Sequence, residues 1–218
     1  MNVLKTIYEL RARAVRRGGG VRTDWKDLMG GPPMQRWKRI GEVFEGIGRP
    51  WATMGAVACR LYKPERTTKD IDILIRARDR ASIEESLARS GFTKSRDLAF
   101  VNQPTWSGTA WTSGRGKRKL DVLSIQARWV DRALALAEEN RDREGLRVLP
   151  FGYLVLTKIE SMRGRDVADL TELLGVAIRL GHTEALERSR ALVRRHLPDR
   201  EEEFDQLLQL GEWEFAPE

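Results

Sequence analysis

Three aspartates lie within otherwise apolar stretches of the sequence. Asp70 and Asp72 alternate with hydrophobic residues in the run Asp-Ile-Asp-Ile-Leu-Ile, and Asp121 interrupts the run Lys-Leu-Asp-Val-Leu-Ser-Ile. Aspartate is disfavoured in strands, and side chains two residues apart in a strand point to the same face. At a separation of about 5 Å and an effective dielectric constant near 20, two carboxylates repel by roughly 3 kcal/mol. A shared divalent cation removes that repulsion, so the pattern favours a Mg²⁺ site.

Asp121 completes this site if its strand and the strand of Asp70 and Asp72 are neighbours. Three converging carboxylates suit two Mg²⁺ ions roughly 3.5–4 Å apart, an arrangement that supports in-line attack on phosphorus. The alternative for a single aspartate at a strand end is a cap or a solvent-facing residue. Two aspartates inside one hydrophobic strand, with a third in another, favour the metal site. We therefore predict that all three are metal ligands and catalytic residues.

Phosphate-binding groups are predicted just upstream of the aspartate pair. Gly55 and Ala56 lie at an expected strand-to-helix turn, where glycine lets the backbone approach a phosphate and the N–H groups of a helix start attract anions. Arg66 and Thr68 precede Asp70 and add a cation and a hydroxyl donor. Tight packing at the turn and an exposed polar loop are the simpler alternatives for these residues.

Hydrophobic periodicity predicts a mixed α+β chain that ends in a helical region. Strands are expected over residues 51–54, 71–75, 98–103, 105–112, 119–125 and 146–149. Helices are expected over residues 37–47, 56–62, 81–90, 129–140, 152–162, 166–180, 183–196 and 199–210. The predicted fold class is α+β, with a mixed β-sheet core that is flanked by helices and followed by a C-terminal helical domain. The expected domains are a basic N-terminal helix and linker (1–35), the sheet core (36–150) and the helical domain (151–218).

The composition is typical of a globular protein, with 218 residues of which 41% are hydrophobic and 33% charged. Its one cysteine, Cys59, excludes an internal disulfide framework and a multi-cysteine zinc site. No apolar run reaches the roughly 20 residues that cross a bilayer, and no signal-peptide core follows the basic N-terminus. We therefore expect no membrane association and a cytoplasmic location.

Basic residues are concentrated in the first 150 residues. This part holds 30 Lys and Arg against 18 Asp and Glu, a net charge of +12, whereas residues 151–218 carry a net charge of −5. An anionic partner such as a nucleotide or RNA fits this asymmetry, and a solvated basic surface is the alternative. RNA contacts are predicted at residues 11–17 and at the tip of an expected hairpin. The tip residues are Arg115, Lys117, Arg118 and Lys119.

In the order Gly55-Ala56, Asp70-Ile71-Asp72-Ile73 and Asp121, the sequence resembles the nucleotidyltransferase superfamily with the DNA polymerase β-like fold. The family signature is a Gly-Gly or Gly-Ser turn, a helix, an Asp-h-Asp-h strand (h is hydrophobic) and a third Asp on a later strand. Ala56 departs from the family's second small residue. The resemblance implies a nucleotidyltransferase-type sheet core, two Mg²⁺ ions bound by the three aspartates, and an NTP substrate.

A narrower resemblance is to AbiEii-like nucleotidyltransferases, which include toxins of toxin–antitoxin and abortive-infection systems. It is carried by Arg66-Thr-Thr-Lys-Asp-Ile-Asp and by the stretch from Leu154 to Leu170, which contains Lys158, Asp166 and Asp169. It implies that Lys158 contacts the triphosphate. Asp166 or Asp169 is expected to orient Lys158 or Arg165, and both aspartates are expected to belong to the NTP site. The alternative for both aspartates is a helix-start charge.

The resemblance implies Mg²⁺-dependent transfer of an NMP from an NTP to an acceptor hydroxyl. A tRNA 3′ end is the first expectation for the acceptor, and an antitoxin protein is an expected partner. A protein hydroxyl or a small molecule such as an aminoglycoside is an alternative acceptor. A catalytically silent nucleotide- or RNA-binding module with the same fold, or an unrelated RNA-binding protein, is an alternative function.

Overall fold

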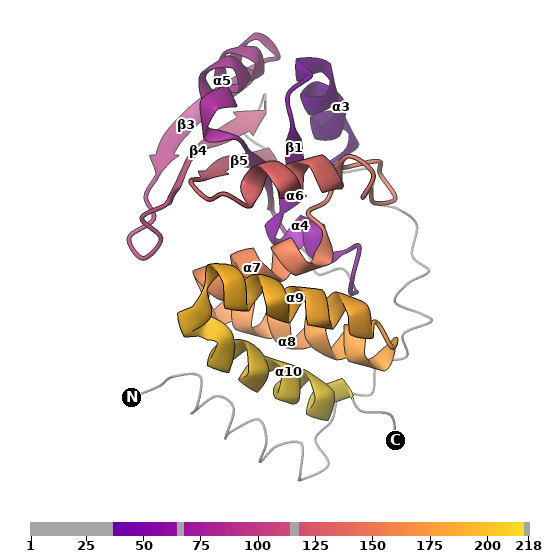
Figure 1. Cartoon of the computed structure of the whole chain (residues 1–218). Helices are drawn as coiled ribbons and strands as arrows, with labels where there is room; N and C mark the ends of the chain where they lie inside the picture. Colours follow the sequence, from indigo (N-terminus) through magenta and orange to yellow (C-terminus); the bar gives the residue numbers. More distant parts are fainter. Residues whose placement is uncertain (1–36, 65–67, 114–117, 216–218) are drawn as a thin grey trace. The chain divides into compact units, whose positions relative to one another are not determined.

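The computed structural model describes residues 37–64, 68–113 and 118–215. The described chain forms two compact units. A sheet unit contains residues 37–61 and 68–150, and a helical unit contains residues 62–64 and 151–215. Figure 1 draws both units and labels helices and strands in each.

The sheet unit is built on a five-stranded mixed sheet of order β1-β2-β5-β4-β3. β2 and β5 run parallel, and the other neighbouring strands are antiparallel. The strands are β1 (Trp51–Met54), β2 (Asp70–Ile75), β3 (Phe92–Leu98), β4 (Trp106–Ser113) and β5 (Arg118–Ile125). This sheet with its helices confirms the predicted α+β class, and β2 contains the expected aspartate pair.

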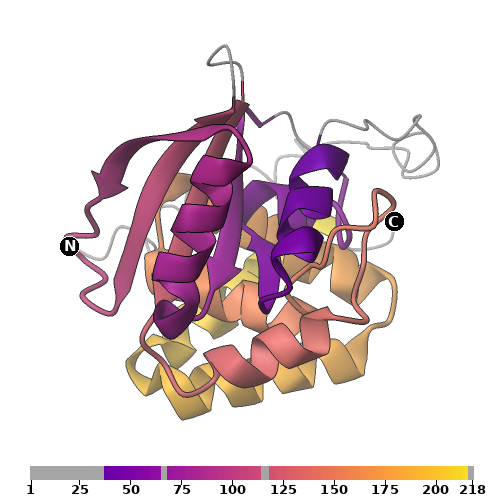
Figure 2. The same ribbon diagram turned by 90° about the horizontal axis from the view of Figure 1, so that it is seen from above.

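Helices α3 (Lys38–Ile47) and α5 (Arg80–Arg89) lie on one side of the sheet, as Figure 2 shows. Their side chains Phe44 and Leu87 belong to one hydrophobic core with Ile71 and Ile73 of β2 and Leu120 of β5. Alternation along β2 and β5 then places the aspartates on the opposite face of the sheet. The sheet unit also contains α4 (Gly55–Cys59), the 3₁₀ helix η1 (Ala77–Asp79) and α6 (Val130–Ala137).

Two predicted strands are wrong. The strand expected at 98–103 lies earlier, as β3, and residues 99–105 form the connection to β4. β3 is an edge strand whose middle is charged and exposed, so it lacks the apolar alternation that marks half-buried strands. The strand expected at 146–149 is reduced to isolated bridges, which include Thr53 with Val148.

The helical unit contains the four helices expected after Pro150. They are α7 (Phe151–Ser161), α8 (Gly164–Arg179), α9 (Thr183–His196) and α10 (Glu201–Phe215), with a 3₁₀ turn η3 (Pro198–Arg200) before the last. α8 and α10 approach closely at two glycines, since a Cβ on Gly211 would lie 2.7 Å from the Gly175 nitrogen. In the described residues, no helix is long and apolar enough to cross a membrane.

Candidate functional site

Asp72 and Asp121 lie side by side on the parallel strands β2 and β5. The register pairs Asp72 with Asp121, and Asp70 with Lys119. Since adjacent strands are about 4.8 Å apart, the two paired aspartates present their carboxylates from neighbouring backbone positions. Both are half-buried, whereas Asp70, at the start of β2, is exposed. The sheet therefore brings together two of the three acids that the sequence predicts as metal ligands.

Gly55 makes room for the Asp72 carboxylate. The φ angle of Gly55 is 63°, a left-handed conformation that favours glycine. A Cβ at this position would lie 2.0 Å from Asp72 Oδ2 and 2.9 Å from its Cγ. The sequence analysis predicts that Gly55 lets the backbone approach a phosphate. In the structure, the group next to Gly55 is the Asp72 carboxylate. The turn before α4 thus forms one wall against Asp72.

α4 is held at its end by a buried arginine. Arg60 Nε donates to Asp142 Oδ2 at 2.8 Å, and Nη1 donates to Glu144 Oε1 at 2.7 Å. Burial opposes the charge of this guanidinium, but the two acids outweigh it and raise the pKa of Arg60. Asp142 Oδ1 also accepts the backbone N–H of Leu146 at 3.0 Å. This network fixes the short helix that begins at Gly55.

Asp70 is engaged locally by Thr68. The Thr68 hydroxyl donates to Asp70 Oδ1 at 2.7 Å. The hydroxyl that the sequence assigned to a phosphate therefore contacts a carboxylate here. Within the described ranges, no group of three or more His, Cys, Asp or Glu side chains is arranged to hold a metal ion.

The pair of Asp72 and Asp121 fits a Mg²⁺ ion by the chemistry of its donors. Mg²⁺ is usually held by one or two carboxylates, with waters and substrate phosphates completing its shell. Asp72 and Asp121 supply two carboxylates on adjacent strands, and Gly55 leaves the first of them space. A second ion would need Asp70 as well, so the two-ion site stays a prediction.

Lys158 lies in a buried network of the helical unit. Its Nζ is 2.7 Å from Asp169 Oδ2 and 3.1 Å from Asp166 Oδ1, and its side chain is only 4% exposed. Lys158 belongs to α7, and both aspartates belong to α8, so these ion pairs join the two helices. Both aspartates that the resemblance links to Lys158 therefore contact it, and their orienting role stays a prediction. The proposed role of Lys158 towards a triphosphate stays a prediction.

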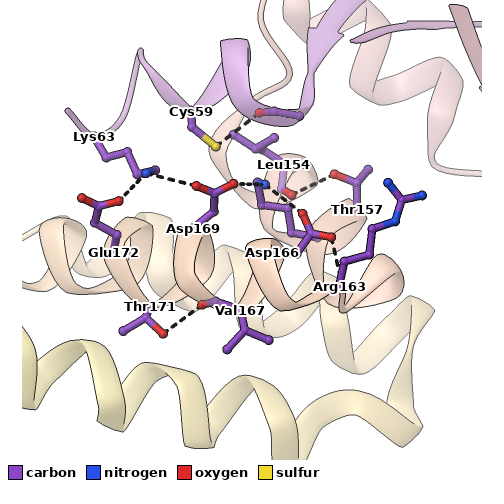
Figure 3. Close-up of polar contacts among 12 residues, drawn as sticks. Cys59, Lys63, Leu154, Thr157, Arg163, Asp166, Val167, Asp169, Thr171 and Glu172 are labelled. Atoms are coloured by element: carbon purple, nitrogen blue, oxygen red, sulfur yellow. Dashed lines mark hydrogen bonds and ion pairs between the residues drawn. The ribbon is translucent and has the colours of Figure 1, made fainter. Parts of the chain in front are cut away.

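A second lysine, which sequence reasoning missed, completes this network. Lys63 Nζ is 3.2 Å from Asp169 Oδ1 and also pairs with Glu172, and its side chain is 2% exposed. Figure 3 shows Lys63 directed at both acids. Asp169 therefore bridges two buried lysines, one from α7 and one from the segment that follows α4 in the chain. Nothing in a loop lysine beside a proline signals such burial, because the partners come from a distant helix.

Asp166 has a second role at the start of α8. Its Oδ2 accepts the backbone N–H of Arg163 at 3.2 Å (Figure 3), which satisfies one of the unpaired donors of a helix start. The helix-start alternative is therefore right for Asp166, which also pairs with Lys158. It does not apply to Asp169, which lies buried in the second turn of α8.

The remaining predicted residues divide between described and undescribed parts. Ala56 is half-buried in α4, and Lys119 is exposed on β5. The other predicted positions lie outside the described residues, namely Arg66, Arg115, Lys117 and residues 11–17. The side chain of Arg118 is not described either. Their predicted roles towards NTP and RNA stay predictions.

No protein-family model matches the sequence, and no curated protein matches it at a significant level. Among solved structures, the crystal structure of ANT(2″)-Ia in complex with adenylyl-2″-tobramycin is similar, with a TM-score of 0.47 and 16% identity over 71% of this chain and 93% of that chain. A solution structure of the antibiotic-resistance factor ANT(2″)-Ia gives a TM-score of 0.47 and 17% identity over 78% and 96% of the two chains. An H. pylori structure described as a nucleotidyltransferase gives a TM-score of 0.40 and 14% identity over 83% and 93%. Similarity at this level does not indicate a function for this chain. The function is therefore inferred from the residues of the chain itself.

Proposed function

We propose that the protein is a Mg²⁺-dependent nucleotidyltransferase, which moves an NMP from an NTP to an acceptor hydroxyl and releases pyrophosphate. The observation that carries the proposal is the pair Asp72–Asp121 on adjacent parallel strands, with Gly55 against the first carboxylate. Two carboxylates on adjacent strands repel each other, and a bound Mg²⁺ would remove that repulsion. The proposed role of these two acids is to bind Mg²⁺ together with the phosphates of an NTP.

Each residue has a proposed part in the reaction. Asp72 and Asp121 hold Mg²⁺, and Asp70 joins them when a second ion is bound. Bound Mg²⁺ neutralises charge on the phosphates. The Asp121 carboxylate accepts the proton of the attacking hydroxyl, as a positioned general base does. Lys158, with Gly55, Ala56, Arg66 and Thr68, contacts the triphosphate, and Asp166 and Asp169 orient Lys158.

The proposed acceptor is an RNA hydroxyl, with a tRNA 3′ end as the specific case. The net charge of +12 on the first 150 residues favours an anionic acceptor. A protein hydroxyl or an aminoglycoside hydroxyl is the alternative acceptor. A role as the toxin of a toxin–antitoxin pair, with an antitoxin partner, follows only from the resemblance to AbiEii-like proteins.

The test is transfer from each labelled NTP with Mg²⁺, offering total cellular RNA and an aminoglycoside as separate acceptors. We expect Asp72→Asn and Asp121→Asn each to reduce transfer by at least about a hundredfold. Asp97→Asn, which changes an exposed acid of β3, is the matched control and should transfer at the wild-type rate. Wild-type rates in both test variants would exclude the mechanism.

A further inference from the structure

The face of the sheet that carries the aspartates continues across β4 and β3 as a polar surface. One register row runs Asp72, Asp121, Ala110, Arg96 across four strands. The row beside it runs Asp70, Lys119, Thr112, Thr93. We name the group Arg96, Ala110, Thr112 and Lys119 the acceptor shelf.

The side-chain contacts confirm that Arg96 lies on the same face as Asp121. Leu98, two residues after Arg96, has its Cδ1 3.3 Å from the Cβ position of Gly108, and Leu123 approaches that same position. Leu123 is two residues after Asp121, so Arg96 shares its face by alternation. Lys94 lies on the other face, 3.9 Å from Glu84 of α5. The register shift between Lys94 and Arg96 separates the two basic side chains.

Arg96 and Lys119 are exposed cations without a protein partner among the described residues. Neither side chain makes a hydrogen bond or an ion pair within the described ranges. Two other arginines of the sheet unit, Arg60 and Arg147, are paired with Asp142 and Glu45. The backbone of Arg96 lies two strands, roughly 10 Å, from that of Asp121.

The shelf residues between the two cations are small or carry a hydroxyl. Ala110 is the register partner of Asp121, so the position directly beside this acid has only a methyl group. Thr112 is the register partner of Lys119, and both Ala110 and Thr112 are half-buried. A chain can therefore lie over β4 without displacing a large side chain.

Resting on the proposed nucleotidyltransferase function, we propose that the acceptor shelf binds the phosphodiester backbone of a single-stranded RNA whose terminal hydroxyl reaches Asp121. An arginine guanidinium matches a phosphate with two parallel hydrogen bonds, and a lysine adds a point charge. An aminoglycoside carries several ammonium groups, which Arg96 and Lys119 would repel. Their charge therefore favours an RNA acceptor over a polycationic one.

The direct test is the affinity of a fluorescent, mixed-sequence single-stranded RNA for the full chain across a salt series. We expect Arg96→Ala and Lys119→Ala each to weaken binding by roughly tenfold. The double variant should flatten the plot of log affinity against log salt by about 1.4 units, because each phosphate contact on a single strand contributes about 0.7. Lys94→Ala, on the other face of the same strand, should bind RNA as the wild type does.

A second measurement separates the shelf from the proposed function. Binding of NTP with Mg²⁺ should be equal in the wild type and Arg96→Glu, while Arg96→Glu loses RNA binding. If the wild type binds no Mg²⁺–NTP, the proposed function is wrong. If it binds Mg²⁺–NTP but RNA affinity is absent, or is the same in Arg96→Glu and Lys94→Ala, the shelf is overturned. Tighter binding of an aminoglycoside by Arg96→Glu, with RNA unaffected, would overturn it as well.

Discussion

Asp72 in the sheet unit and Asp169 in the helical unit are both acids in largely apolar surroundings, but their neighbours differ. Asp72 lies beside another acid, Asp121, on the adjacent strand. Asp169 lies between two lysines, with Lys158 at 2.7 Å and Lys63 at 3.2 Å. Asp72 and Asp121 bring two negative charges together. In the helical unit, two lysines compensate the negative charge of Asp169. In the proposed function a bound cation balances the first pair, whereas two lysines of the protein balance the acid of the second.

The comparison predicts opposite effects when an acid is removed from each region. We expect Asp169→Ala to lower the free energy of unfolding by about 3–5 kcal/mol, because it leaves two buried lysines without their shared partner. Asp72→Asn should leave the free energy of unfolding unchanged or raise it slightly, since it relieves repulsion with Asp121. Urea unfolding of both variants measures the difference.

Asp205→Ala is the control for this pair of variants. Asp205 is 50% exposed and pairs with Arg190 at 2.8 Å, so its loss should cost less than about 1 kcal/mol. If Asp169→Ala is as mild as Asp205→Ala, the buried network contributes little. If Asp72→Asn is as severe as Asp169→Ala, Asp72 has a structural role that its place beside Asp121 does not explain.

Gly55 and Gly48 both have a left-handed backbone, and comparing their alanine variants tests the role of Gly55 beside Asp72. Gly55→Ala would place a Cβ 2.0 Å from the Asp72 carboxylate, whereas Gly48→Ala meets nothing within 4 Å. Their φ angles are close, at 63° and 68°. Gly48→Ala should therefore cost only the left-handed conformation, about 1–2 kcal/mol. Gly55→Ala should cost more and should also abolish nucleotide transfer, because it displaces Asp72.

Thermal unfolding and single-turnover transfer, measured on both glycine variants, separate conformational strain from the collision with Asp72. Equal loss of stability in the two variants, with transfer retained in Gly55→Ala, would show that the carboxylate moves aside without consequence. The role of this turn as a wall of the site would then be wrong.

The sequence predicted the elements whose pattern is local. The alternation of Asp70 and Asp72 with isoleucines located β2, and the same reasoning placed Asp121 on a strand, which the structure shows to be the parallel neighbour. β3 was misplaced because an edge strand with exposed charges has no apolar period. The pairing of Asp72 with Asp121 needed the register, which no local pattern contains.

The buried network of the helical unit was only partly predictable. The resemblance connected Lys158 with Asp166 and Asp169, and these residues do contact one another. Lys63 was missed because its partners, Asp169 and Glu172, lie more than a hundred residues further along the chain. Charge compensation over such a separation depends on tertiary packing. Single-sequence periodicity reports only on neighbours along the chain.

Lys158 tests whether the helical network has a function beyond stability. Lys158→Met removes the charge and keeps the aliphatic stem, while Asp169 keeps Lys63 as partner. We expect a loss of about 1–3 kcal/mol in the free energy of unfolding, and a rise in KM for the NTP if Lys158 contacts the triphosphate. Steady-state transfer at a temperature where the variant is fully folded measures the second effect.

Lys63→Met is the matched control, because it removes a buried lysine from the same acid. A comparable loss of stability with an unchanged KM for the NTP would assign nucleotide contact to Lys158 alone. If both variants change KM equally, or neither does, Lys158 belongs only to the structural network, and the proposed triphosphate contact is wrong.

The smallest effect is expected at a partly exposed ion pair, which marks the other end of the scale from Asp169. Glu45 of α3 accepts from Arg147 Nη2 at 2.7 Å and from Arg141 Nη1 at 2.8 Å. Burial acts to raise the pKa of Glu45, but the two arginines outweigh it and lower this pKa from its ordinary value. A carboxylate whose folded pKa is lowered stabilises the fold above its unfolded pKa, and loses that stabilisation as the pH falls through the folded pKa.

Glu45→Gln should therefore cost less than about 1 kcal/mol at pH 7, because its side chain is 36% exposed to screening solvent. The cost should vanish in the acid range below the folded pKa, so the unfolding free energies of wild type and variant should converge there. A difference that stays constant from pH 7 to the acid range would mean that the contacts of Glu45, rather than its charge, support α3.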